Sequence, residues 1–197
     1  MELTSDKNKR FRRLSHRGRR PRRPAYAQSV GAKTGVNSAL GITPSTPDFV
    51  KEAAQSDLFE IQSSQLAEQK SDDAATKSFA QKMVTDHTKT TNDIKSMVSG
   101  GKLKGVELPT DMASSQKSML DKLKGLNGKD FTKQYHSDQV SGHKDAVSLF
   151  ERYGKGGDNP ELKEWANKTP SKWRKTSTSD ATAHRLIGKC TGAGAAP

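Results

Sequence analysis

The sequence has one cysteine and few aromatic residues, and each shortage excludes a class of protein. Cys190 alone can form neither an intramolecular disulfide bond nor a zinc site built from several cysteines. No apolar run approaches the roughly 18 residues that a membrane-spanning helix needs. Hydrophobic residues make up 30% of the chain and aromatic residues 6%. This content is too low for the continuous apolar strands of a parallel sheet, but a helical bundle needs only about three apolar positions in seven.

The middle of the chain also lacks net charge, although the whole chain has a formal charge of +12. Residues 1–24 contain ten basic and two acidic residues, and residues 170–197 contain five basic and one acidic residue. The 145 residues between them hold equal numbers of basic and acidic side chains, and that length suits one domain. The charge therefore marks the ends of the expected domain and is weak support for an acidic partner such as nucleic acid.

Helical periodicity predicts an all-α, up-down bundle of the four-helix type over residues 47–169. Thr46 is suited to cap the first helix, and Pro47 suits its first position. No segment alternates apolar and polar residues as a strand does. The helical spacing of apolar residues covers about 47–69, 74–99, 112–124, 130–153 and 160–169.

The segments outside the bundle carry no helical period. Residues 1–27 form an arginine-rich head and residues 170–197 a tail, and we expect both to be disordered. Residues 28–46 are rich in Gly, Ser and Thr, which indicates a linker. Ala25-Tyr26-Ala27 has the small-x-small pattern of a secretory cleavage site, but no apolar segment precedes it. As written, the chain is therefore expected to stay in the cytoplasm.

Four polar residues of the bundle are candidate metal ligands. Glu60, His87 and His143 each lie three, four or seven residues from apolar residues of their own helix, so they point inward from three different helices. Together with Asp86, they could converge as a site of carboxylate and imidazole ligands for a divalent metal or iron. The Glu-x-x-His signature of di-iron bundles is absent. The favoured interpretation is that both histidines are buried or half-buried and hydrogen-bonded across the bundle, and the metal site is the alternative.

No motif of enzymatic catalysis stands out, so a non-enzymatic protein is the favoured interpretation. The sequence has no Gly-x-Ser-x-Gly motif. The glycine-rich segment at 154–158 lacks the Lys-Ser/Thr ending of a phosphate-binding loop and indicates a helix end. The arginine-rich head could bind nucleic acid without sequence preference, but it has one aromatic residue and precedes a neutral domain.

Parts of the chain resemble a bacterial family of exported domains of unknown function. The similar stretches are 79–94 (FAQKMVTDHTKTTNDI), 123–151 and 158–169, with residues 46–67 similar to the first helix. The resemblance implies a ferritin-like bundle and a periplasmic or outer-membrane-associated location, because members are often labelled as outer-membrane or exported proteins. It implies no reaction. The recurrent polar residues of the family fall on Glu60, Asp86, His87, Tyr135 and His143.

The two ends of the chain depart from this family. Its members usually begin with a hydrophobic signal peptide and continue after the fifth segment into a helix with another histidine. Residues 1–24 and 170–197 show neither feature, and we hypothesise that both are misread coding sequence, so that the head is a degenerate signal-peptide region.

Three functions follow from the sequence. The first is a non-enzymatic, envelope-associated bundle with a stress or interaction role, whose partners would be a second copy or envelope components. The second is a ferritin-like metal-binding or redox protein that uses Glu60, His87 and His143. The third is nucleic-acid binding through residues 1–24.

Overall fold

The computed structural model describes residues 41–169, which form five helices and no strand. The helices are α2 (Thr46–Lys70), α3 (Ala74–Ser99), α4 (Ser114–Gly125), α5 (Gly128–Gly156) and α6 (Pro160–Lys168). The prediction of an all-α fold is thus confirmed. The predictions for the head, most of the linker and the tail, including nucleic-acid binding through residues 1–24, lie outside the described residues.

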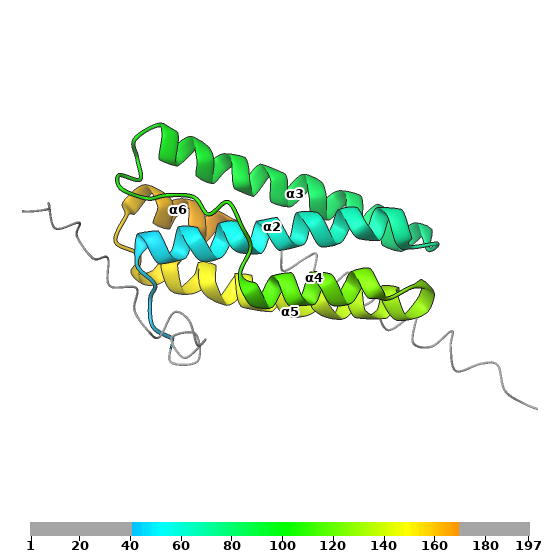
Figure 1. The fold of residues 1–197 in the computed structure, drawn as a ribbon. Coiled ribbons are helices and arrows are strands. Elements are labelled where there is room, and N and C mark those ends of the chain that lie inside the picture. Colours follow the sequence, from blue (N-terminus) through cyan, green and yellow to red (C-terminus); the bar gives the residue numbers. More distant parts are fainter. Residues whose placement is uncertain (1–40, 170–197) are drawn as a thin grey trace, which may run out of the picture.

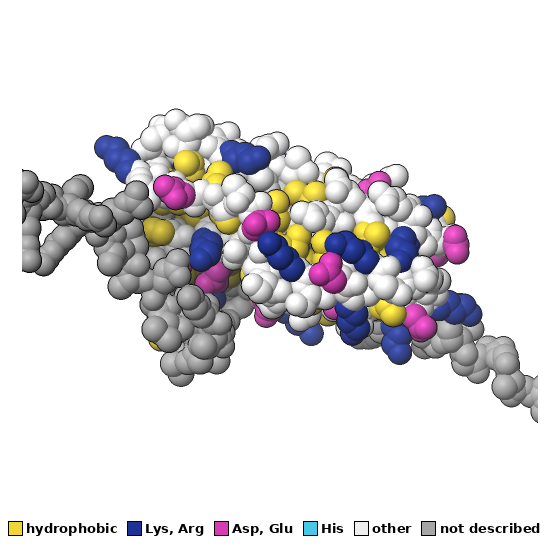
Figure 2. Space-filling model, in the orientation of Figure 1, with side chains coloured by type: hydrophobic (Ala, Val, Ile, Leu, Met, Phe, Trp, Pro, Cys, Tyr) yellow, Lys and Arg dark blue, Asp and Glu magenta, His cyan; other side chains and the backbone are white. Residues whose placement is uncertain are grey.

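The helices run up and down, with α2 near the middle of the bundle (Figure 1). α2 packs against α3 on one side and against α4 and α5 on the other, and α6 packs against α5. Within residues 41–169, no helix is both long and apolar enough to cross a membrane. Lys, Arg, Asp and Glu side chains are interspersed over the face seen in Figure 2, in line with the balanced charge of this part of the chain.

Side-chain caps set where several helices begin. The Asp73 carboxylate accepts a hydrogen bond from the Thr76 backbone at 2.7 Å and starts α3. Asn159 caps α6 in the same way through the Leu162 backbone, at 2.9 Å. Such caps satisfy backbone donors that the first turn of a helix leaves without partners.

The cap expected at Thr46 is one residue earlier in the structure. Ser45 caps α2, and its hydroxyl accepts a hydrogen bond from the Asp48 backbone. The prediction of Thr46 was wrong because its hydroxyl points inward, where it contacts the Tyr153 hydroxyl and the Asp158 carboxylate.

The core consists of two apolar clusters with a polar layer between them. On α3, Ala80 belongs to one cluster and Ile94 to the other, and His87 lies between them. On α5, Phe131 and Phe150 belong to different clusters, and His143 lies between them in the same way. The middle of the bundle is therefore where buried polar groups from several helices meet.

Candidate metal centre

Glu60, His87 and His143 meet in this polar layer from α2, α3 and α5. Each is only 1% exposed. One donor atom from each side chain can be chosen so that all of them lie within 4.8 Å of one another. The two imidazole rings stack with their centroids 5.7 Å apart. The structure thus brings together three of the four residues that the sequence indicated.

The separation of these donor atoms is close to what a metal ion requires. Metal–ligand bonds of about 2.1 Å place neighbouring ligands of a tetrahedral ion about 3.4 Å apart. Donor atoms within 4.8 Å of one another would have to approach by at most about 1.4 Å to reach that spacing. Two imidazoles and one carboxylate are a common donor set for divalent transition metals.

Asp57 holds one of the two histidines. The Nδ1 of His87 donates to Asp57 Oδ1 at 2.7 Å, and both side chains are almost fully buried. The other carboxylate oxygen accepts a hydrogen bond from the Thr91 hydroxyl at 3.1 Å. Because Nδ1 is occupied by Asp57, Nε2 is the nitrogen of His87 that can face a metal.

The two histidines have opposite pKa shifts. Burial opposes a charge on His87, but its hydrogen bond to Asp57 and the negative charges of Asp57 and Glu60 raise its pKa above the ordinary value. Burial, and after it the nearby charge of His87, lower the pKa of His143 to about 4. Burial also raises the pKa of Asp57, against the hydrogen bonds that it accepts. His143 is therefore neutral at pH 7 and has a lone pair available to a metal.

Close packing of α5 against Glu60 completes the site. A Cβ on Gly142 would lie 2.6 Å from Glu60 Oε1, so a larger residue at this position would force the buried carboxylate to shift. In the part of the chain that the structure describes, Nε2 of His143 has no hydrogen-bond partner. The buried imidazole is thus free to serve as a ligand.

A second polar layer lies next to this group. Gln139 is one turn before His143 on α5, and its amide donates to the Ser63 hydroxyl at 3.3 Å. The Tyr135 hydroxyl hydrogen-bonds to Ser64 at 2.9 Å. Tyr135, which the resemblance singled out, therefore lies in the interior of the bundle and outside the group of three ligands.

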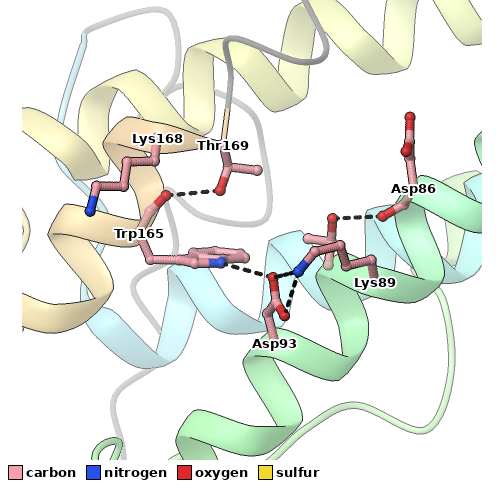
Figure 3. A pocket seen from close by; sticks show the side chains of 7 residues that line it. Asp86, Lys89, Asp93, Trp165, Lys168 and Thr169 are labelled. Atoms are coloured by element: carbon pink, nitrogen blue, oxygen red, sulfur yellow. Dashed lines mark hydrogen bonds and ion pairs between the residues drawn. The ribbon is translucent and has the colours of Figure 1, made fainter.

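Asp86 also lies outside the group. Its carboxylate forms an ion pair with Lys82, and its side chain is 26% exposed. It lines a surface pocket of about 150 Å³ between α3 and α6 (Figure 3), together with Lys89, Thr90, Asp93, Trp165, Lys168 and Thr169. In this pocket the Trp165 indole donates to Asp93 at 3.4 Å, and Lys89 pairs with the same carboxylate.

Asp57 is the residue of the site that the sequence reasoning missed. It lies three residues before Glu60, and residues three apart share a helical face. The same helical spacing that places Glu60 on the inward face of α2 therefore also places Asp57 on that face. Asp86 adjoins His87 in sequence, but adjacent helical residues point in different directions, so its carboxylate lies outside the ligand group.

The comparison with known families gives a match over most of the chain. A family model described as "Domain of unknown function (DUF4142)" covers residues 31–178, which include all residues of the cluster. No curated protein and no solved structure matches the chain.

Proposed function

The chain belongs to the DUF4142 family, a domain of unknown function, and we propose that it is a metal-binding helical bundle. Glu60, His87 and His143 are the ligands of one divalent transition-metal ion. The observation that carries the proposal is that their donor atoms converge within 4.8 Å from three helices while the side chains are buried.

The energetics of burial favour this function over hydrogen-bonded histidines alone. Burying a carboxylate and imidazoles costs free energy unless each has a partner. The bond to Asp57 accounts for Nδ1 of His87. Nε2 of His143 has no such partner among residues 41–169. A bound cation would supply one and would balance the buried negative charge.

The donor set narrows the choice of ion. Imidazole suits zinc, iron and other first-row metals, whereas calcium and magnesium prefer sites made only of oxygen ligands. A copper(I) site would need sulfur ligands, which the cluster lacks. We therefore expect Zn²⁺, Fe²⁺ or another first-row divalent ion that imidazole suits.

The test is metal binding by the purified full-length chain. After dialysis against a chelator, Zn²⁺ is titrated in competition with a chromophoric chelator, and the bound metal is counted by elemental analysis. We expect one ion per chain in the parent and a loss of affinity of at least about tenfold in His143→Asn.

A matched control comes from the same helix. His136 is also buried on α5, but it hydrogen-bonds to Thr76 and lies outside the cluster. His136→Asn should bind Zn²⁺ like the parent. A parent chain that binds no metal, or a His143→Asn chain that binds as tightly as the parent, would refute the proposal.

We also propose that this ferritin-like bundle acts in the cell envelope, where it would meet any partner. The support is the family resemblance of residues 79–94 and 123–151 and the cleavage pattern at Ala25-Tyr26-Ala27. The test fractionates cells that express the native gene, read with the hydrophobic signal segment that the resemblance implies, beside cells that express the chain as written. We expect the native product in the envelope fraction with Gln28 as its N-terminus, and the chain as written, which lacks an apolar segment before Ala25-Tyr26-Ala27, uncleaved in the cytoplasm. An uncleaved, cytoplasmic native product would contradict the proposal.

A further inference from the structure

We infer that Asp57 is a positioning residue of the metal site and acts on the ion through His87. This inference rests on the proposed function. Asp57 is not one of the three ligands. The inference comes from the 2.7 Å hydrogen bond that its Oδ1 accepts from Nδ1 of His87. Asp57 is 2% exposed, so water does not compete for this bond.

The first consequence of the contact is orientation. An imidazole can rotate and can carry its proton on either nitrogen. A carboxylate that accepts from Nδ1 fixes both choices and leaves Nε2 with the lone pair. Nε2 of His87 is then the atom that faces Glu60 and His143, so the tautomer that can bind the ion is already in place before the ion binds.

The second consequence is charge. Asp57 and Glu60 lie one turn apart on α2, and both are buried. With two neutral imidazoles, their two negative charges balance one divalent cation. An uncompensated charge is costly in a buried site, so Asp57 favours an ion of charge two over one of charge one or three.

Thr91 extends this arrangement to the contact between two helices. It lies one turn after His87 on α3, and its hydroxyl donates to Asp57 Oδ2 at 3.1 Å. His87 and Thr91 therefore hold both oxygens of one carboxylate from the neighbouring helix. The packing of α3 on α2 and the geometry of the metal site are in this way set by the same residues.

The test compares Asp57→Asn with Asp86→Asn in the full-length chain. Asparagine keeps the shape of the side chain but removes its charge and weakens the bond to His87. We expect Asp57→Asn to lose about 10- to 100-fold in Zn²⁺ affinity and to shift the visible absorption bands of the Co²⁺-loaded protein. Asp86→Asn removes the aspartate next to His87 in sequence and should change neither readout.

A second pair of variants covers the case in which Asp57→Asn does not fold, as judged by circular dichroism. Thr91→Val removes one hydroxyl at constant shape, and we expect a loss of a few-fold in Zn²⁺ affinity. Asp57→Glu restores the charge and should recover part of the affinity and the Co²⁺ spectrum. A purely structural role of Asp57 would alter the unfolding midpoint without moving the Co²⁺ bands.

The outcomes separate this inference from the proposed function. If the parent binds Zn²⁺ and His143→Asn does not, but a folded Asp57→Asn chain keeps the parent affinity and Co²⁺ spectrum, the inference on Asp57 is wrong and the metal site stands. Should Asp57→Asn not fold, unchanged affinity and spectrum in Thr91→Val overturn it in the same way. If the parent binds no metal, both fail.

Discussion

His143 shows how burial at one residue sets a property of the whole chain. Its pKa is lowered to about 4 in the folded state, whereas an exposed imidazole titrates near 6.5. Between these values the unfolded chain binds a proton that the folded chain does not. The free energy of unfolding therefore falls as the pH decreases through this window.

The first prediction concerns this pH dependence in metal-free protein. Urea unfolding is measured at pH 7, 5.5 and 4.5 for the parent and for His143→Asn. We expect the parent to lose up to about 3 kcal/mol more than the variant between pH 7 and 4.5, since each pKa unit is worth about 1.4 kcal/mol. The pKa of His87 is raised in the folded state. Its contribution to the free energy of unfolding is therefore present below pH 6.5 and is lost as the pH rises through that folded-state pKa. Equal pH slopes in both proteins would contradict the prediction.

At the scale of the element, α5 depends on a close approach to α2. The Gly142 backbone lies against the Glu60 carboxylate, and a Cβ would come within 2.6 Å of Oε1. Gly125, the last residue of α4, has open space where a Cβ would be placed. The two glycines therefore form a matched pair, one constrained by its neighbour and one not.

The second prediction uses this pair. Gly142→Ala should cost about 1–3 kcal/mol of unfolding free energy because an inserted methyl group forces the neighbouring atoms to move. It should also weaken Zn²⁺ binding, since Glu60 must shift. Gly125→Ala should be neutral or slightly stabilising because alanine favours helix. Chemical denaturation of both variants tests this, and equal stabilities would count against the close contact.

The third prediction concerns the start of α3. The Asp73 carboxylate accepts hydrogen bonds from the backbone and hydroxyl of Thr76, and chiefly the hydroxyl bond lowers its pKa. Asp73→Ala should cost about 1 kcal/mol, and the contribution should be lost as the pH falls through the lowered pKa. Asn127 precedes α5 without a side-chain cap bond, so Asn127→Ala should change little. Thermal unfolding of both variants at pH 7 gives the comparison.

Much of the architecture of the whole molecule could be predicted from local patterns. Apolar spacing alone indicated the all-α fold and the inward faces of Glu60, His87 and His143. The same spacing could also place Asp57 on the inward face of α2, but it could not show that Asp57 is the partner of His87, because that pairing depends on how α2 and α3 are aligned. The shift of the first cap to Ser45 has a similar cause, since Tyr153 lies more than 100 residues from Thr46 in sequence.

The fourth prediction belongs to the whole molecule. Two apolar clusters flank the polar layer, so an ion bound there joins α2, α3 and α5 at mid-bundle. Zn²⁺ at about 100 times its Kd should add about 2.7 kcal/mol to the stability of the folded chain. We expect a higher Tm in Zn²⁺ than in chelator for the parent, and no difference for the triple variant Glu60→Gln, His87→Asn, His143→Asn. A parent Tm that does not respond to Zn²⁺ would contradict this.

The burial of all three ligands, each 1% exposed, also has a kinetic consequence. An ion held there can leave only after the surrounding helices open locally, and such openings are rare in well-packed cores. The rate of zinc loss should therefore be limited by opening of the bundle and should not depend on the concentration of a chelator in large excess. A release rate that rises in proportion to chelator would instead indicate an ion within reach of solvent. The protein would then retain its metal because the helices open slowly, as well as because the metal binds tightly.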